Sequence, residues 1–258
     1  MSQLRFEVDG HQCSFDTARG VSLAIPMQFG GPQPNFFSAP AASAEPLQAP
    51  DFTGDTRTGG SCNVGRYRLV PHCNGTHTEC IGHLVDDTAA VAEQLRVSLL
   101  PATLMTLAPR HNLIDATLIK MSLQHHPLRA MHTAFIIRTL PNSKDKLTRH
   151  YDAVPPACLS AEATALLANS GVEHLLVDLP SLDPMHDQGQ LAAHRAFWGL
   201  PEGSRRLADA KRPHATITEM IYVADQVKDG YYLLDLQVPA FMSDAAPSRP
   251  IIYPVDIK

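Results

Sequence analysis

The sequence has no dense cluster of Lys or Arg, and charged residues make up only 18% of its 258 positions. The formal net charge is −5, so we expect no nucleic-acid partner and no anionic-membrane partner. No apolar run approaches the roughly 20 residues that a membrane-spanning helix needs. The N-terminus, MSQLRFEVDGHQCSF, lacks the basic segment and apolar run of a signal peptide.

Cysteine is scarce and irregularly placed. The five residues are Cys13, Cys62, Cys73, Cys80 and Cys158. An odd number without regular spacing does not form a disulfide framework. These absences together predict a soluble, reduced, cytoplasmic protein. Its hydrophobic content of 44% is enough for the core of one large domain.

Hydrophobic periodicity predicts a mixed α/β domain over 1–258. Strand patterns occur at 4–8, 21–27, 66–70, 132–140, 172–183, 216–227 and 231–241, and helical patterns at 86–95, 160–171 and 190–200. The helix at 160–171 has Ser160 as a good N-cap and Gly171 after its last turn. The order strand, helix, strand from 132–140 to 172–183 predicts a parallel crossover.

A stretch rich in Pro, Gly, Ala and Ser covers residues 28–63. Loops of this length are uncommon in compact domains unless they act as lids or binding loops or are disordered. Phe36, Phe37 and Phe52 lie in it. These aromatic rings either anchor the loop to the core or cover a planar aromatic substrate.

The segment HCNGTHTECIGH at 72–83 concentrates imidazole, thiol and carboxylate groups, which pack poorly in an apolar core. One interpretation is a polar turn with solvated side chains. A second is a structural zinc site, with spacing tighter than that of common zinc fingers, made by Cys73, His77, Cys80 and His83. A third is a catalytic metal site.

The third interpretation follows from the local spacing. His77 and Glu79 project to the same face of an extended backbone, because they are two residues apart. Cys73 precedes them across an Asn-Gly turn, and His83 follows after a second glycine. Three such groups can hold a divalent cation while the fourth moves protons.

The run Gly75-Thr76-His77-x-Glu79-x-x-x-His83 resembles the His-x-Gly-Thr-His-x-Asp-x-Pro-x-His signature of the cyclase-like metal hydrolases, a family that includes bacterial kynurenine formamidase and isatin hydrolase. Three later segments are similar to family features in the same order. They are SLD at 181–183 followed by His194, Glu219 in ATITEM, and DAAPSR at 244–249. The resemblance covers residues 20–253.

The resemblance implies a single domain of the swivelling β/β/α type and a kynurenine formamidase-like amidohydrolase. Such an enzyme cleaves an amide, formamide or lactam C–N bond in a small molecule by metal-activated water. The implied metal ligands are Cys73, His77, Glu79, His194 and Glu219, and the implied catalytic residues are His83 and His194. The resemblance also implies one or two divalent ions, zinc or alternatively manganese, and a homo-oligomer.

Two departures from the signature keep other functions open. Cys73 stands where the family has histidine, with His72 one residue out of register, and Glu79 replaces aspartate. Thiolate favours zinc over manganese as the bound metal. The alternatives are a catalytically inactive binding protein with the cyclase fold, and a structural zinc module.

Overall fold

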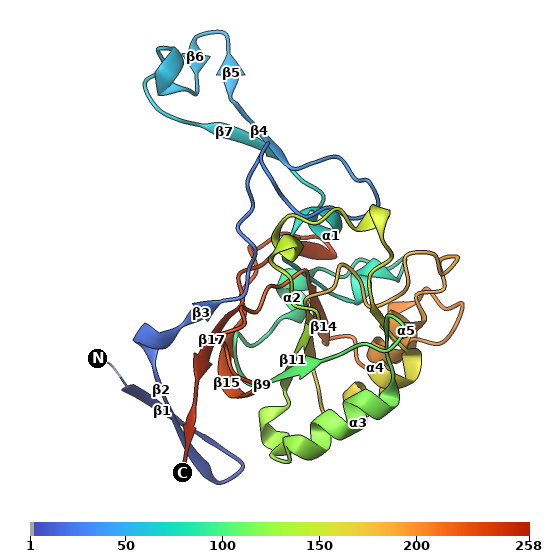
Figure 1. Ribbon diagram of the computed structural model, residues 1–258. Coiled ribbons are helices and arrows are strands. Elements are labelled where there is room, and N and C mark those ends of the chain that lie inside the picture. The colour runs from blue at the N-terminus through green and yellow to red at the C-terminus, as the bar shows by residue number, and fades with distance from the viewer. Residues whose placement is uncertain (1–2) are drawn as a thin grey trace.

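The computed structural model describes residues 3–258, and its centre is a nine-stranded mixed sheet (Figure 1). The strands lie in the order β16-β8-β14-β13-β11-β9-β15-β17-β3. Their bounds are β3 (Val21–Ser22), β8 (His77–Glu79), β9 (Leu99–Leu107), β11 (Ala134–Thr139), β13 (His174–Val177), β14 (Thr216–Glu219), β15 (Gly230–Asp235), β16 (Ala245–Pro247) and β17 (Ile251–Pro254). Strands β9, β11, β13 and β14 are mutually parallel, whereas the outer pairings are antiparallel.

Both faces of the central strands are apolar and covered, as expected for buried parallel strands. Phe135 and Ile137 of β11 belong to the cluster that packs against helices α3 (Ala116–His125), α4 (Ala161–Asn169) and α5 (Ala192–Trp198). Ile136, between them in sequence, belongs to a second cluster on the opposite face. The parallel sheet therefore has two separate layers of core.

The remaining elements are short. A three-stranded sheet joins β1 (Gln3–Val8) and β2 (His11–Asp16) to β18 (Asp256–Ile257), and a parallel pair joins β10 (Leu113–Ile114) to β12 (Cys158–Leu159). Two single-turn helices are α1 (Pro71–Asn74) and α2 (Val91–Gln94). The 3-10 turns are η1 (Thr17–Arg19), η2 (Thr56–Thr58), η3 (Ile81–His83), η4 (Arg129–Met131), η5 (Lys144–Leu147), η6 (Tyr151–Ala153) and η7 (Leu207–Asp209).

The predicted crossover is confirmed, because β11 and β13 pair in parallel on either side of α4 in the chain. The Ser160 hydroxyl accepts a hydrogen bond from the Ala163 amide, and Gly171 has a left-handed φ of 92°. The helix expected at 86–95 is shorter in the structure, where only Val91–Gln94 is helical. Helix α3 was not predicted, although Asp115 caps it by accepting from the Leu118 amide.

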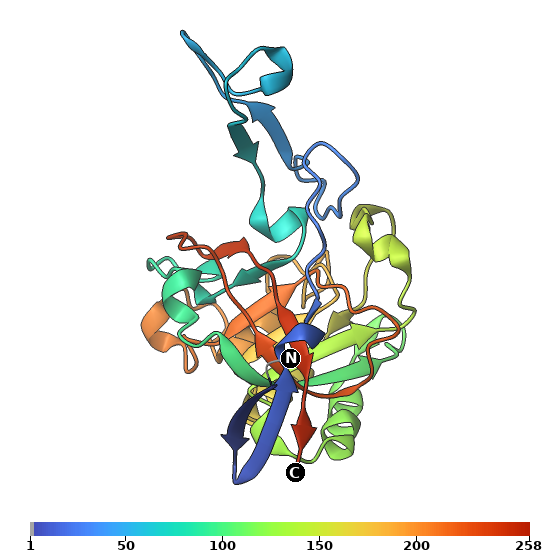
Figure 2. The ribbon, with the colours of Figure 1, turned by 90° about the vertical axis from the view of Figure 1, so that its left-hand side faces the viewer.

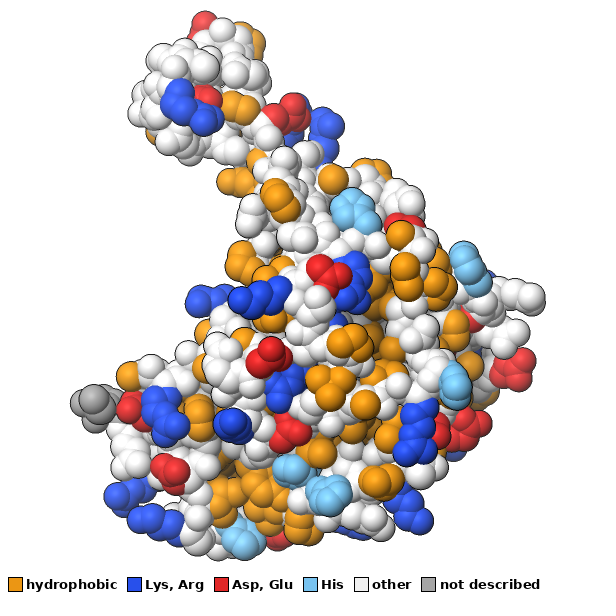
Figure 3. All heavy atoms as spheres, in the orientation of Figure 1, with side chains coloured by type: hydrophobic (Ala, Val, Ile, Leu, Met, Phe, Trp, Pro, Cys, Tyr) orange, Lys and Arg blue, Asp and Glu red, His pale blue; other side chains and the backbone are white. Residues whose placement is uncertain are grey.

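The stretch expected as a loop at 28–63 contains much of an ordered arm. Strand β4 (Ser43–Pro46) pairs with β7 (Gly65–Arg68), and a small hairpin of β5 (Gln48–Ala49) and β6 (Phe52–Thr53) forms the tip. Figures 1 and 2 show this arm projecting from the body, and Figure 3 shows its tip as a lobe on a narrow neck. The tip is tightly packed, because a Cβ at Gly60 would clash with the Thr53 carbonyl oxygen.

Within residues 3–258, none of the helices has the length and apolar character needed to cross a bilayer.

We expect the free energy of unfolding to depend on pH through His174, at the start of β13. This side chain is 4% exposed, and its Nδ1 lies 2.8 Å from the Thr216 hydroxyl. Burial, aided by the Arg212 charge, lowers the pKa of His174 from 6.5 to about 4. Between these values the unfolded chain binds the proton and the folded chain does not. The free energy of unfolding therefore falls as pH falls through this window, by up to ~3 kcal/mol.

We expect a His174→Gln variant to lose this contribution, and its stability relative to wild type should rise as pH falls from 6.5 to 4. Urea unfolding across this range measures the difference. The exposed His111→Gln substitution is the matched control and should leave the pH dependence of stability unchanged. A parallel response of His174→Gln and wild type at all pH values would contradict the burial effect.

Candidate metal centre

The register of β8 against β14 brings the first two candidate ligands together. His77 is paired with Glu219 and Thr78 with Thr218. The His77 Nε2 atom lies 3.5 Å from a Glu219 carboxylate oxygen. Thr78 and Thr218, one residue along each strand, join their hydroxyls at 2.8 Å. The strand pairing therefore places His77 and Glu219 on one face of the sheet and the two threonine hydroxyls on the other.

Thr76 fixes the start of β8. Its hydroxyl accepts from the Ile25 amide at 2.9 Å and donates to the Met220 carbonyl at 2.5 Å. The His77 Nδ1 atom lies 2.9 Å from the Gly75 carbonyl, so its ring donates there and presents Nε2 toward Glu219. The local backbone thus selects which nitrogen of His77 is free to bind a cation.

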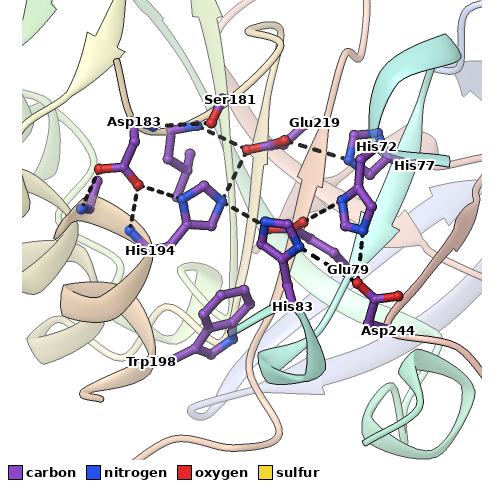
Figure 4. Close-up of polar contacts among 12 residues, drawn as sticks. His72, His77, Glu79, His83, Ser181, Asp183, His194, Trp198, Glu219 and Asp244 are labelled. Atoms are coloured by element: carbon purple, nitrogen blue, oxygen red, sulfur yellow. Dashed lines mark hydrogen bonds and ion pairs between the residues drawn. The ribbon is translucent and has the colours of Figure 1, made fainter. Parts of the chain in front are cut away.

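Helix α5 contributes His194, which completes the buried cluster (Figure 4). Its Nε2 atom is 3.0 Å from one oxygen of Glu79 and 3.4 Å from Glu219. Both glutamates and both histidines, His77 and His194, are at most 3% exposed. Segments more than 100 residues apart in sequence therefore supply one compact group of donors.

Asp183 orients His194 and was not identified as a site residue from the sequence. Its carboxylate accepts from His194 Nδ1 at 2.5 Å and from the backbone amides of Ala193 and His194 at 2.7 and 3.1 Å. These bonds outweigh burial and lower the pKa of Asp183. They also satisfy amides at the start of α5, whose N-cap residue, Leu191, makes no side-chain cap. Two local signals point to Asp183: its position in the loop after β13 and its place in the SLD segment at 181–183.

The structure brings His72, rather than the predicted Cys73, into a donor set with His77 and Glu79. His72 Nδ1 is 2.9 Å from Glu79, and its Nε2 is 2.9 Å from Asp244. The reason is the helical turn of α1, in which successive side chains are rotated by about 100°. Cys73 is buried on another side of this turn, and its carbonyl accepts from the Phe36 amide.

The structural zinc arrangement does not assemble among the described residues. Cys80 is fully buried in the apolar core, with its thiol toward the Ala89 carbonyl. Neither Cys73 nor Cys80 belongs to any set of three donors whose ligand atoms lie within 4.8 Å of one another in residues 3–258. The two sets that involve the buried cluster are His72, His77 and Glu79, and Glu79, His194 and Glu219.

His83 lies at the outer side of the cluster, at the end of η3. Its side chain is 29% exposed, and its Nδ1 is 3.6 Å from Asp244. The His83 ring centroid is 4.4 Å from that of His72 and 5.7 Å from that of His194. It is therefore placed between solvent and the buried donors.

The charges in the cluster are strongly coupled. Burial raises the pKa of Glu79, but the charges of His83 and His194 outweigh it and hold that pKa well below 4.5. Burial lowers the pKa of His194, yet Glu79 and Asp183 raise it well above 6.5. For His72, Asp244 and Glu79 overcome burial and raise the pKa to about 10. Buried carboxylates thus require positive charge beside them, which either imidazolium or a metal ion can supply.

The donor set fits a divalent metal. His77 Nε2, His194 Nε2 and both carboxylate oxygens of Glu79 are buried and have no well-aligned hydrogen bond, and their close contacts are ion-pair distances within the cluster. Buried polar atoms without partners are costly, and a shared cation satisfies them together. Imidazole nitrogens with carboxylate oxygens suit zinc and also harder ions such as manganese. Glu79 belongs to both sets, so its two oxygens allow one ion or two.

Comparison with known proteins agrees with the fold and the motifs. The Cyclase family model matches residues 21–184. The chain belongs to the Cyclase family. A kynurenine formamidase of Bacillus cytotoxicus is 29% identical over 198 residues, covering 76% of this chain and 82% of that protein. The family resemblance inferred from the motifs is therefore confirmed.

Solved structures confirm the α/β fold class. An isatin hydrolase bound to the product analogue thioisatinate superposes with a TM-score of 0.61 at 12% identity, covering 93% of this chain and 94% of that one. A protein of Bacillus stearothermophilus described as a predicted metal-dependent hydrolase gives a TM-score of 0.59 at 14% identity, covering 91% and 97%. At these identities the likeness concerns the fold alone.

The position of His72 leads to a direct test of ligand assignment. We expect His72→Ala to lower zinc affinity by roughly 10-fold or more, because it removes a donor, and Cys73→Ala to retain wild-type affinity. Competition with a chromophoric chelator measures both. Circular dichroism serves as the control for folding. If Cys73→Ala lost zinc and His72→Ala retained it, Cys73 would be the ligand, as the sequence predicts.

Proposed function

We propose that this protein is a metal-dependent amidohydrolase, kynurenine formamidase-like, that cleaves an amide, formamide or lactam C–N bond. The observation that carries the proposal is the convergence of buried imidazole and carboxylate groups that contact one another, beside a partly exposed imidazole. Membership of the Cyclase family and the similarity to kynurenine formamidases support the same activity. The alternative is a catalytically inactive binding protein with the cyclase fold, which would bind metal without hydrolysing amides.

Two ligand groups would hold the metal. His72, His77 and Glu79 form one group, and Glu79 together with His194 and Glu219 forms the other. A divalent ion at such a site lowers the pKa of water toward neutrality and polarises the substrate carbonyl. With Cys73 outside the cluster, the chain offers nitrogen and oxygen donors only, so zinc and manganese both fit.

The chain's own residues then divide the remaining work. His83 accepts a proton from the attacking water and returns it to the leaving nitrogen, because its imidazole is reachable from solvent and close to His194. Asp244, whose carboxylate lies 3.6 Å from His83 Nδ1, favours a proton on that nitrogen and leaves Nε2 free. Asp183 keeps the His194 ring in the tautomer that presents Nε2 to the glutamates.

Phe36 is buried whereas Phe37 is exposed, so only Phe37 is available to contact a substrate. Phe36 is buried against Tyr151 and Met220 and anchors its loop. Phe37 is 58% exposed, with its ring centroid 4.0 Å from that of Phe36. The Phe36 amide donates a hydrogen bond to the Cys73 carbonyl of α1. The two phenylalanines therefore lie beside α1, which carries His72 of the cluster. Phe37 is therefore available to contact a planar aryl amide or lactam.

The decisive experiment combines elemental analysis with an activity screen. Purified protein should contain zinc or manganese and should hydrolyse members of a panel of formamides, lactams and other amides. Chelation should abolish turnover without unfolding the chain. His83→Ala should lower kcat by about 100-fold or more and keep the metal, because it removes only proton transfer.

The exposed His214→Ala variant is the matched control and should keep full turnover. Metal bound without hydrolysis of any amide in the panel would favour the inactive binding protein. Unfolding upon chelation would instead favour a structural zinc module. Loss of metal from His83→Ala would contradict its role in proton transfer.

We further propose a homo-oligomer in which the arm packs against a second copy. A two-stranded ribbon is marginally stable alone in water. The arm carries three large exposed apolar side chains, Leu47, Val64 and Tyr67. Burial of these groups in a neighbouring copy would stabilise the ordered tip.

Light scattering tests the arm. We expect wild-type protein to be larger than one chain of 28.1 kDa, and Leu47→Glu combined with Val64→Glu to shift it toward monomer. Val154→Glu, at a 70% exposed apolar position on the body, is the matched control and should not change the mass. An unchanged mass for the arm variant would contradict this role.

A further inference from the structure

A third donor set lies outside the buried cluster. It consists of His72, His83 and Asp244, whose ligand atoms lie within 4.8 Å of one another. All three residues are partly exposed, in contrast to the buried His77, His194 and both glutamates. We propose that these three side chains form an outer, solvent-reachable cation site that competes with the inner one and inhibits the enzyme.

The competition follows from the position of one ring. His72 lies between two carboxylates, with Nδ1 2.9 Å from Glu79 and Nε2 2.9 Å from Asp244 (Figure 4). When a cation takes one ring nitrogen, the other nitrogen of the neutral imidazole keeps the single ring proton. A cation at the inner site takes Nδ1 and leaves the Nε2 proton to Asp244. A cation at the outer site takes Nε2 and leaves the Nδ1 proton to Glu79.

With the cation at either site, one nitrogen of His72 binds the cation and the other donates its proton to a carboxylate. Neither state therefore leaves a nitrogen of His72 without a partner. The two cations nevertheless cannot share a neutral ring. An ion on Nε2 removes one of the three donors, His72, from the inner group that contains His77 and Glu79. It also occupies His83, whose Nδ1 lies 3.6 Å from Asp244. A single event at the outer site therefore weakens the inner site and blocks proton transfer.

The donor types set the class of ligand. Two imidazoles and one carboxylate suit a first-row transition ion such as Zn²⁺ and are poor ligands for Mg²⁺ or Ca²⁺, which prefer oxygen. Partial exposure leaves room for water at the remaining positions and lowers affinity relative to the buried groups. The outer site should consequently fill only at zinc concentrations above those that load the inner site.

This inference rests on the proposed place of His72 in the inner group, and its test has a readout that does not need turnover. Protein labelled with ¹⁵N-histidine and loaded with zinc is titrated with further Zn²⁺. Ring ¹⁵N shifts distinguish protonated from unprotonated nitrogen, and the His72 signals are assigned by their absence in His72→Ala. We expect the His72 proton to move from Nε2 to Nδ1 as zinc exceeds the loading concentration.

Turnover provides the second readout. Excess Zn²⁺ should inhibit wild-type enzyme reversibly, and MgCl₂ at the same concentration should not. Asp244→Asn removes the anionic donor and should raise the zinc concentration for half-inhibition by at least about 10-fold. Asp86→Asn is the matched control, an exposed carboxylate that should leave inhibition unchanged.

The outcomes separate this inference from the proposed function. An unmoved His72 proton at every zinc concentration, or equal inhibition of Asp244→Asn and wild type, overturns the outer site. Should Asp244→Asn not fold, the ¹⁵N titration of His83→Gln replaces it: this variant should require more zinc than wild type, and an equal requirement overturns the outer site. If no substrate is turned over but the His72 proton moves, the outer site stands and the amidohydrolase proposal does not.

Discussion

The antiparallel pairing of β8 with β14 is the constraint on which the candidate site depends. It places His77 opposite Glu219 and leaves Glu79, two residues further along, within reach of His194 from α5. A slip of one residue would turn His77 and Glu79 to the face that Thr78 now occupies. The hydroxyl pair of Thr78 and Thr218 and the two bonds of the Thr76 hydroxyl oppose such a slip.

The sheet around this pairing explains why the cluster can remain buried. Central strands covered on both faces form a rigid support, and α5 packs its Phe197 and Trp198 into the larger apolar cluster. The Trp198 indole donates to the Ala215 carbonyl at 2.8 Å, just before β14. The helix that carries His194 is thus tied to the strand that carries Glu219. This packing supports the donors in addition to the hydrogen bonds that orient His77 and His194.

Features that depend on short-range spacing could be predicted from the sequence. The strands, the α4 caps and the i, i+2 relation of His77 and Glu79 are local, and the family motif added His194 and Glu219. The exchange of Cys73 for His72 could not be predicted in this way, because it depends on whether residues 71–74 are extended or helical. Asp183 and Asp244 acquire their partners only in three dimensions. Of the arm, only the strand predicted at 66–70 corresponds to an observed strand, β7, because β4, β5 and β6 lie among prolines and glycines that usually indicate irregular structure.

The pairing of the two chain ends has a consequence for biosynthesis. Strand β3 adds to the main sheet only through β17, and β2 pairs with β18 as well as with β1. Strand β3 therefore cannot join the main sheet until β17, which is far away in the sequence, has been translated. Asp244 and β16, which flank β8 on its other side, are also translated long after β8. The edge of the sheet beside the site therefore folds late, because it depends on contacts between segments far apart in the sequence, and such contacts form slowly.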